Sequence, residues 1–385
     1  MLQSAELIKD EITAWRREFH QQPELGFQEV HTAKRVADIL ELSGCRVKRG
    51  VGRTGVVGEL GTGTPVLAIR ADMDALPIME ANDIPYASQI PGVMHACGHD
   101  AHTAILLGTA RLLKQKEFKG SVRFLFQPAE EVGDEEGISG APRMIQDGAM
   151  QGVEGILALH VDASLPVGCI SLESGLSSAG VDTFYASIIG KGGHGASPHK
   201  VIDPIHIAGH VILALHGIVS RKLHPYEPAV VSIGSIHAGG ASNVIPERVE
   251  ISGTLRFMEQ SVQEKIHQEI KNAMQVTRSL GGDYELKMEI GYPPMNNDPH
   301  MVSLIREVAV GILGKDQVQE PPKEMGSEDF GCFCELTPGA MFYLGARLED
   351  DERYHHSPYF DIDERCLPVG SALLAEIALR FLDKN

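Results

Sequence analysis

Residues 94–102 of this chain read MHACGHDAH, and these nine positions hold one cysteine, three histidines and one aspartate. Cys97 and His99 are two residues apart, so on extended or loop backbone both side chains point to the same side. A thiolate and a neutral imidazole suit zinc, nickel, cobalt or manganese far better than calcium or magnesium. The stretch therefore predicts a transition-metal site rather than a helix entry with incidental histidines.

The surrounding sequence excludes a closed zinc finger. No second cysteine or histidine pair follows at finger-like spacing, so the remaining ligands must come from distant parts of the chain. Distant ligands are typical of catalytic metal sites, which keep one coordination position open. The run TAILLGTARLL (103–113) follows directly and predicts a helix, with Asp100 placed to cap its N-terminus.

The composition is that of an ordinary globular protein. The 385 residues suffice for two domains, and 43% of them are hydrophobic and 22% charged. A formal net charge of −18 argues against nucleic acid or an anionic membrane surface as a partner.

Compartment signals favour the cytoplasm. Charged residues are spread through the first twenty positions, which argues against a signal peptide, and no apolar run approaches the length of a membrane span. The six cysteines, at positions 45, 97, 169, 332, 334 and 366, are scattered and do not form a disulfide framework. We therefore expect a reducing location.

Strands alternate with helices in the first half of the chain. The expected elements are helices over 4–19, 29–42 and from about 101, and strands over 55–60, 65–70, 121–127 and 155–160. This order predicts an α/β fold with a mostly parallel sheet, whose ligands bind at the carboxyl ends of the strands. Five acidic or imidazole side chains fall at those ends: Asp72, Asp74, Glu130, Glu131 and His160.

The pattern changes near residue 180. From 181 to 290 strands and helices suggest a compact α+β layer, the size of one small domain. The expected organisation is a discontinuous catalytic domain, residues 1–180 and 291–385, with a second domain, 181–290, inserted in it.

The run QPAEE (127–131) places two carboxylates just past a strand end. Neighbouring side chains diverge there, so one carboxylate can bind a metal while the other accepts a proton from water. The alternative is a solvated acidic loop, because residues 134–136 are also acidic. His160 ends an apolar strand, and YHHSP (354–358) offers a further ligand from a loop.

Taken together, these motifs resemble the metal-dependent amidohydrolases, which include hippurate hydrolases, aminoacylases, N-acetyl-diaminopimelate deacetylases, indole-acetyl-amino-acid hydrolases and related carboxypeptidases. The matching stretches are RADMDALP (70–77), MHACGHDAH (94–102), QPAEE (127–131), GKGGHGASPH (190–199), NVIPE (243–247), GTLR (253–256), GSEDF (326–330) and HSP (356–358). They occur in the family's order across nearly the whole chain. The resemblance implies a dinuclear metallopeptidase-like α/β catalytic domain with an inserted α+β lid domain that makes a homodimer.

The resemblance also implies a metal-site role for particular residues. Cys97 is expected to bridge two divalent ions, of zinc, manganese, nickel or cobalt. The other ligands are expected in two pairs, His99 with His160 and Glu131 with His356. Glu130 matches the general base, and Asp72 and Asp74 are expected to support the ligands rather than bind metal.

Three residues of the inserted domain resemble substrate-contacting residues of the family. His194 matches a histidine that polarises the scissile carbonyl, commonly in the partner subunit's site. Asn243 and Arg256 match residues that hold the carboxylate of the substrate. These assignments rest on the resemblance alone.

The expected function is metal-dependent hydrolysis of the amide bond of N-acyl amino acids, such as N-acetyl or benzoyl derivatives. A carboxypeptidase or dipeptidase using the same site is the first alternative. A cysteine hydrolase using Cys97 with His99 or His95 would need no metal, and a non-catalytic dimeric scaffold would need no general base. The sequence leaves the acyl group, the amino-acid side chain and the native metal open.

Overall fold

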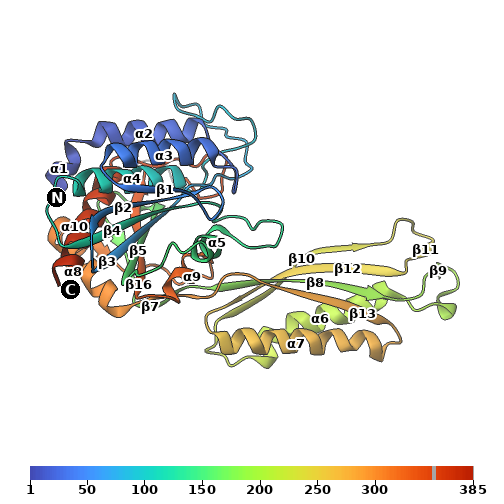
Figure 1. Ribbon diagram of the computed structural model, residues 1–385. Coiled ribbons are helices and arrows are strands. Elements are labelled where there is room, and N and C mark those ends of the chain that lie inside the picture. Colours follow the sequence, from blue (N-terminus) through green and yellow to red (C-terminus); the bar gives the residue numbers. More distant parts are fainter. Residues whose placement is uncertain (349–352, 385) are drawn as a thin grey trace. The chain divides into compact units, whose positions relative to one another are not determined.

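The computed structural model describes residues 1–348 and 353–384, which divide into two compact units (Figure 1). Unit 1 comprises Met1–Ser177, Asn296–Pro322 and Asp329–Asn385. Unit 2 comprises Ser178–Met295 and Lys323–Glu328. The chain therefore leaves unit 1 once for a long excursion and once for a short one.

Unit 1 is built around an eight-stranded mixed sheet. Its strand order is β1 (Arg46–Val51), β2 (Gly55–Thr62), β4 (Gly120–Gln127), β3 (Val66–Asp72), β5 (Gly155–Pro166), β16 (Gly339–Arg347), β6 (Ile170–Ser171) and β15 (Val318–Gln319). The central strands β4, β3, β5 and β16 are parallel to one another. Every residue of β3 is buried, as expected for a parallel strand covered on both faces.

The helices of unit 1 come from both ends of the chain. They are α1 (Leu2–Glu6), α2 (Lys9–Gln21), α3 (Val30–Leu42), α4 (His99–Leu113), α5 (Gly140–Gln146), α8 (Pro299–Leu313), η2 (Lys315–Gln317), α9 (Gly331–Cys334) and α10 (Cys366–Lys384). One hydrophobic cluster joins Ala5 of α1, Ile12 of α2, Leu106 of α4 and Leu373 of α10. The first and last helices of the chain thus share one core. The short strands β7 (Gly175–Ser178) and β14 (Met295–Asn297) pair separately.

Two predictions for the helices of unit 1 are wrong. The helix expected over 4–19 is divided, because α1 ends at Glu6 and α2 begins at Lys9. Asp100 does not cap α4; the N-cap is Gly98, whose φ is 90°. The buried Asp100 carboxylate instead accepts a hydrogen bond from Arg16 Nε at 2.8 Å and lies 2.7 Å from His20 Nδ1. A buried guanidinium requires a carboxylate partner, and this requirement outweighs capping.

Unit 2 is an antiparallel four-stranded sheet with two long helices. Its elements are β8 (Gly180–Ile189), β9 (Gly193–His194), η1 (Pro198–Lys200), α6 (Pro204–Lys222), β10 (Ala229–Ala238), β11 (Val244–Ile245), β12 (Arg248–Phe257), α7 (Gln260–Ser279) and β13 (Asp283–Ile290). The strand order is β10-β12-β8-β13. The short strands β9 and β11, which are far apart in sequence, pair in a separate antiparallel two-stranded ladder. Burial alternates along β12, so one face of the sheet packs against α6 and α7.

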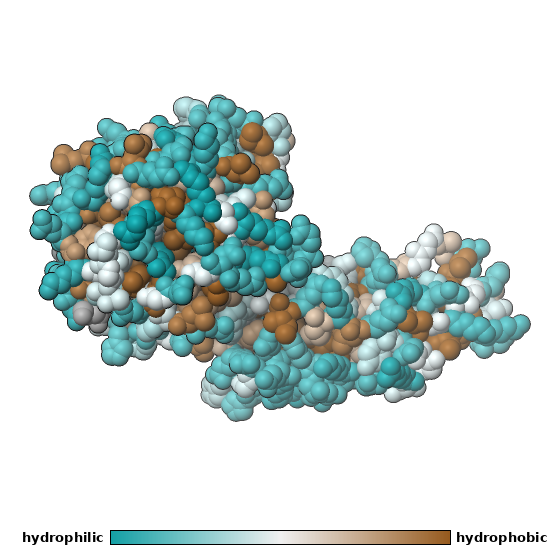
Figure 2. Space-filling model, in the orientation of Figure 1, coloured by the Kyte–Doolittle hydropathy of each residue, from teal (hydrophilic) through white to brown (hydrophobic). Residues whose placement is uncertain are grey.

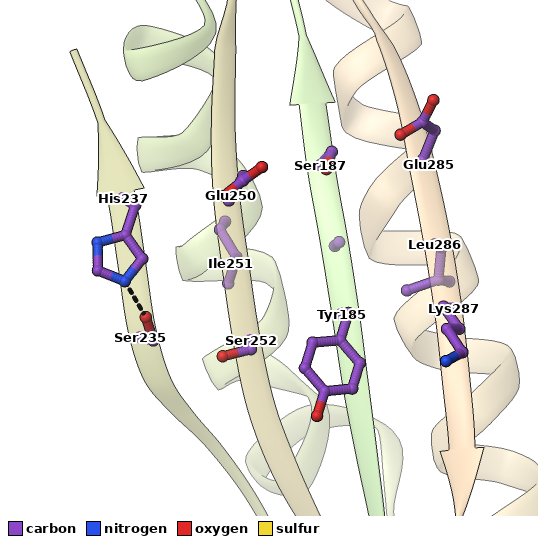
Figure 3. Close-up of a pocket in the computed structure, with 11 residues that line it drawn as sticks. Tyr185, Ser187, Ser235, His237, Glu250, Ile251, Ser252, Glu285, Leu286 and Lys287 are labelled. Atoms are coloured by element: carbon purple, nitrogen blue, oxygen red, sulfur yellow. Dashed lines mark hydrogen bonds between the residues drawn. The ribbon is translucent and has the colours of Figure 1, made fainter. Parts of the chain in front are cut away.

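The other face of this sheet is polar. Its side chains line a shallow pocket across all four strands, in which Ser235 Oγ lies 2.8 Å from His237 Nε2 (Figure 3). The pocket contains none of the residues predicted to form the catalytic or substrate-binding site. It does not bear on the predicted chemistry.

The surface is mainly polar. Figure 2 shows hydrophilic residues over most of the visible face, with apolar residues in small separate groups. In the part of the chain that the structure describes, none of the helices combines the length and the apolar character that a bilayer span requires.

Candidate metal centre

Parallel strands of unit 1 bring the predicted acidic ligands together. Asp72 is the last residue of β3, and Glu130 and Glu131 follow β4. Because β3 and β4 are parallel neighbours, these carboxylates meet at one edge of the sheet. His160 lies in β5 beside β3, but β5 continues to Pro166, so the prediction that His160 ends its strand is wrong.

Two groups of donor atoms share Cys97. Cys97, His99 and His160 form one group, and Cys97, Glu131 and His356 form the other; in each group the donor atoms lie within 4.8 Å of one another. The Cys97 Sγ atom is 3.5 Å from His160 Nε2. His356 Nε2 is 3.2 Å from Glu131 Oε1. The structure therefore places all five predicted ligands in one cluster with the sulfur between the two groups.

The thiol, carboxylate and imidazole groups of the cluster shift one another's pKa values. Burial acts to raise the pKa of the Cys97 thiol, but the imidazoles of His160, His355 and His356 hold it well below its usual value. Burial acts to lower the pKa of His160, but the Cys97 thiolate raises it to about 9. Hydrogen bonds with Cys97 and Glu131 raise the pKa of His356 to about 10. Such a site attracts positive charge, which a divalent cation supplies in place of protons.

A second layer of hydrogen bonds orients the ligands. His160 Nδ1 lies 2.8 Å from the Val161 carbonyl oxygen, which leaves Nε2 directed at Cys97. Asp74 serves two ligands, because Oδ1 lies 3.1 Å from His99 Nδ1 and Oδ2 accepts from the Glu131 amide at 3.0 Å. Carboxylates that fix a ligating histidine in this way are usual at metal sites.

Asp72 and His102 form a further group with His99, but their polar atoms are already used. His102 Nδ1 lies 2.6 Å from Asp72 Oδ1, and His102 Nε2 accepts from the Val161 amide at 2.9 Å. The other Asp72 oxygen pairs with Arg70 at 2.6 Å. His102 therefore has no lone pair left for a metal, and Asp72 is held as the partner of a buried cation.

Glu130 stands beside this cluster. Its side chain is buried, and a carboxylate oxygen lies within 4.8 Å of the donor atoms of His99 and Glu131. A carboxylate at this distance can reach a water molecule next to the cluster without itself completing either group around Cys97. This is the placement that the proton-acceptor role requires.

His355 is a neighbour of the cluster that sequence reasoning did not separate from His356. Its Nε2 accepts from the Ala163 amide at 3.3 Å, and its ring centroid is 5.4 Å from that of His160. The only sequence signal was the His-His pair in YHHSP, which does not tell which ring turns toward the metal. His356 does so because its backbone adopts a φ of 60°, with its amide bonded to the Ala96 carbonyl.

In unit 2 the structure brings His194 and Asn243 together. His194 of β9 pairs with Val244 of β11, and the Gly195 amide donates to the Asn243 carbonyl at 2.8 Å. His194 Nδ1 accepts from the Ala196 amide at 3.0 Å, which leaves Nε2 directed away from that turn. We name residues 193–195 and 243–245 the His194 hairpin; Figure 1 shows β9 and β11 at one end of the unit 2 sheet.

Arg256 lies near the opposite end of β12 from this hairpin. Its guanidinium donates a hydrogen bond to the Ser327 hydroxyl, and burial lowers its pKa. Within residues 1–348 and 353–384, Arg256 forms no ion pair with a carboxylate. Ser327 was not assigned a role from the sequence, although it lies in the GSEDF stretch. The half-buried guanidinium is thus available to an anion.

The donor set of unit 1 fits a divalent metal. The His99 Nε2 atom is buried and lacks a hydrogen-bond partner among the described residues, while its Nδ1 is held by Asp74. A metal ion is the partner that such an atom lacks, and thiolate, imidazole and carboxylate together suit transition metals. An α/β core that presents this cluster beside the buried Glu130 carboxylate is typical of a metallohydrolase.

Comparison with known proteins gives the family. The sequence model of peptidase family M20/M25/M40 matches residues 68–380, and the chain belongs to this family. The N-acetyl-L-cysteine deacetylase of Bacillus subtilis is 38% identical over 98% of this chain and 90% of that protein. Thermostable carboxypeptidase 2 of Saccharolobus solfataricus is 39% identical over 98% of this chain and 97% of that protein.

A solved structure agrees with these relatives. A dinuclear metal-binding peptidase of the M20 family from Bacillus subtilis is 36% identical, with a TM-score of 0.85 over 99% of this chain and 100% of that chain. The predicted α/β fold and the family resemblance are confirmed. The protein is a metal-dependent hydrolase that acts on amide bonds.

Proposed function

We propose that this enzyme hydrolyses the amide bond of N-acyl amino acids, using two divalent metal ions of zinc, manganese, nickel or cobalt. One observation carries the proposal: two groups of three donor atoms share the Cys97 sulfur, and Glu130 stands beside them. Cys97, His99 and His160 would hold one ion, and Cys97, Glu131 and His356 the other. Because Cys97 belongs to both groups, five residues would suffice to hold two ions.

The chemistry follows from the placement of the protein groups. Divalent ions in the cluster would polarise the scissile carbonyl and acidify the attacking water. Glu130 accepts the proton of that water and returns it to the leaving nitrogen, so that a carboxylate and a free amino acid are released. His194 donates a hydrogen bond to the carbonyl oxygen as negative charge builds there.

Arg256 supports a substrate that carries a carboxylate. A half-buried guanidinium without an ion-pair partner among the described residues is suited to bind one, and the Ser327 hydroxyl fixes its direction. Asn243 would assist from the His194 hairpin. N-acyl amino acids and short peptides both end in a carboxylate, so a carboxypeptidase remains the second candidate. The names of the deacetylase and carboxypeptidase relatives match these two candidates.

A homodimer explains how His194 and Arg256 serve one substrate. Arg248, beside the His194 hairpin, and Arg256 are separated by eight residues of β12, which corresponds to about 26 Å. An N-acyl amino acid spans about two residues, or about 7 Å. One copy of unit 2 cannot place both side chains on such a molecule. We therefore infer that His194 and Asn243 act in the active site of a partner subunit.

A surface suited to self-association lies on α6 of unit 2. Leu213 is 73% exposed, and a side chain added at Gly209 or Gly217, four residues before and after it, would meet no atom within 4 Å. An exposed leucine flanked by glycines on one helix face can pack against the same face of a second copy. The edge strand β10 lies next to α6. These features support unit 2 as the dimerisation surface.

The reducing cytoplasm is the location that we propose, because none of the six cysteines forms a disulfide among the described residues and Cys97 must stay a thiolate to bind metal. The activity is tested by reconstituting metal-free protein with manganese, zinc, nickel or cobalt and measuring hydrolysis of N-acetyl and N-benzoyl amino acids beside dipeptides. Faster hydrolysis of the acyl amino acids is expected. Activity that survives verified metal removal would refute the mechanism, and preference for dipeptides would favour the carboxypeptidase.

A further inference from the structure

The peptide before Glu130 has an unusual conformation. Ala129 is fully buried, and its φ of 45° lies in the left-handed region that non-glycine residues rarely adopt. This conformation sets the direction in which the chain delivers Glu130 and Glu131. A strained residue at such a position persists only where its surroundings hold it in place.

Glu29 supplies one of the contacts that hold this peptide. Its Oε1 accepts a hydrogen bond from the Ala129 amide at 2.8 Å, and the Ala129 carbonyl accepts one from the Gly140 amide at 2.9 Å. Both polar groups of Ala129 are therefore fixed. Glu29 comes from the segment before α3, distant in sequence from every residue of the metal cluster.

Another residue caps α3, so the Glu29 side chain is available for this contact. Glu29 is the N-cap residue of α3, and at this position a side-chain oxygen commonly accepts hydrogen bonds from the first helical amides. Here Glu24 accepts them instead, from His31 at 3.0 Å and Thr32 at 2.8 Å. The Glu29 carboxylate makes no side-chain capping bond and turns into the protein.

The position of Glu29 is energetically unfavourable for a residue with no role. The side chain is completely buried, and within the described ranges no cationic side chain forms an ion pair with it. Burial raises its pKa to about 7. Besides the Ala129 amide, its only other side-chain hydrogen-bond donor among the described residues is the Thr54 hydroxyl. A buried carboxylate that makes so few contacts costs stability, so the Ala129 contact calls for an explanation.

We propose that Glu29 is a positioning residue of the active site: its carboxylate holds Ala129 in the left-handed conformation and thereby directs Glu130 toward the attacking water and Glu131 toward the metal. The proposal rests on the roles proposed above for these two glutamates. Gly26 supports the same peptide from another side, because a Cβ added there would lie 3.0 Å from Ala129 Cβ and 2.5 Å from Val132 Cγ2.

Five variants separate positioning from general packing. Glu29→Ala removes the acceptor, whereas Glu29→Gln keeps an oxygen for the Ala129 amide. Thr54→Val is the matched control, because it removes the other hydrogen bond of Glu29 and leaves Ala129 untouched. Gly26→Ala pushes on Ala129 without changing Glu29. Ala129→Gly, added to Glu29→Ala, makes the left-handed conformation accessible without the acceptor.

The readouts are kcat and KM for an N-acetyl amino acid, and the visible absorption of the cobalt-loaded protein, which reports the arrangement of ligands around the metal. We expect Glu29→Ala to lower kcat about a hundredfold with little change in KM, the scale of a small misplacement of a reacting group. The cobalt bands should shift. Gly26→Ala should change both readouts in the same direction. If Glu29→Ala does not fold, Gly26→Ala tests the proposal in its place.

Glu29→Gln and Thr54→Val should stay within about threefold of the parent protein, since the Ala129 contact is kept. Ala129→Gly should restore kcat about tenfold in the Glu29→Ala background, because glycine adopts a positive φ without steric cost.

Three outcomes would overturn the proposal. These are an unchanged kcat and cobalt spectrum in folded Glu29→Ala and Gly26→Ala, an equal loss in Thr54→Val, or no recovery with Ala129→Gly. Should the parent protein hydrolyse no amide offered, the proposed function fails while the cobalt spectra still decide the role of Glu29.

Discussion

The metal cluster of unit 1 and the His194 hairpin of unit 2 are built in opposite ways. In the cluster, the rings of His99 and His160 are each directed by a second contact, to Asp74 and to the Val161 carbonyl. In the hairpin, His194 is exposed, and its side chain accepts one hydrogen bond from the adjacent turn. Glycines at 192, 193 and 195 surround it.

The difference shows where each unit obtains its precision. Metal ligands must be held to within a fraction of an ångström, so unit 1 orients them within its own fold. In our proposal, His194 acts in the site of a second subunit and needs no such support in the isolated chain. We therefore expect substitutions in the cluster to act on metal binding, and substitutions in unit 2 to act on turnover and association.

The largest effect is expected for Cys97→Ser, which replaces the shared soft thiolate with a neutral hydroxyl. Metal content, measured by atomic emission, should fall severely. Activity should fall by more than about a thousandfold, beyond the about 10- to 100-fold loss typical of supporting residues. Cys332→Ser, outside the cluster, is the control and should retain both. A Cys97→Ser protein that binds its full metal content and is active would contradict the role that we assign to the metal cluster.

Within the cluster, substitutions of the two adjacent glutamates should have different effects. Glu130→Gln should keep metal bound and lower kcat about 100- to 10,000-fold, the scale of a lost general base. Glu131→Gln should instead reduce metal content. The two measurements are kcat under saturating metal and metal bound after dialysis. If both variants behave alike in both measurements, the division of labour between the two residues is wrong.

The His194 hairpin gives the next effect. His194→Ala should lower kcat about 100- to 1000-fold, as for a lost oxyanion donor, and leave metal content unchanged. Mixing it with Glu130→Gln tests the partner arrangement, because a heterodimer then holds one site with both Glu130 and His194 intact. Partial recovery of activity is expected.

This mixing experiment has clear contrary outcomes. Verified heterodimers without recovery would place His194 in the site of its own chain. An active enzyme that is strictly monomeric would remove the partner arrangement altogether.

The smallest effect is expected on α6. Leu213→Glu should weaken the dimer, with a dissociation constant raised about tenfold or more, as for a central interface residue. Turnover measured well above that constant should change little, because Leu213 contacts no reacting group. Gln268→Glu on α7 adds the same charge at another exposed helix position and serves as the control. Dissociation constants are measured by sedimentation. Equal values for both variants and the parent would show that Leu213 lies outside the dimer interface.

Much of unit 1 could be predicted from local patterns. Buried strands such as β3 are short apolar runs, and the dense MHACGHDAH stretch pointed to metal before any partner ligand was known. The ligand pairs required the family resemblance, since spacing alone does not reveal which distant side chains meet. The capping role expected for Asp100 was wrong because Arg16, 84 positions away, pairs with it in the core.

The distances between the predicted site residues of unit 2 could not be predicted from the sequence either. The sequence shows His194, Asn243 and Arg256 as three motif residues, but not that β12 separates Arg256 from the other two. Likewise, the sequence showed Glu29 only as the first residue of a predicted helix, because only the fold brings its carboxylate to the Ala129 amide.

The shared core of the first and last helices of unit 1 has a consequence for biosynthesis. Leu373 of α10 packs in the same cluster as Ala5 of α1 and Ile12 of α2, so this core cannot close until α10 has left the ribosome. Residues 178–295 hold nearly all of unit 2 and its separate apolar cluster, and they are available earlier. Unit 2 can therefore fold while the N-terminal half of unit 1 still waits with apolar surface exposed. During that interval the nascent chain exposes apolar surface that a chaperone can cover, and its predicted metal ligands are not yet assembled.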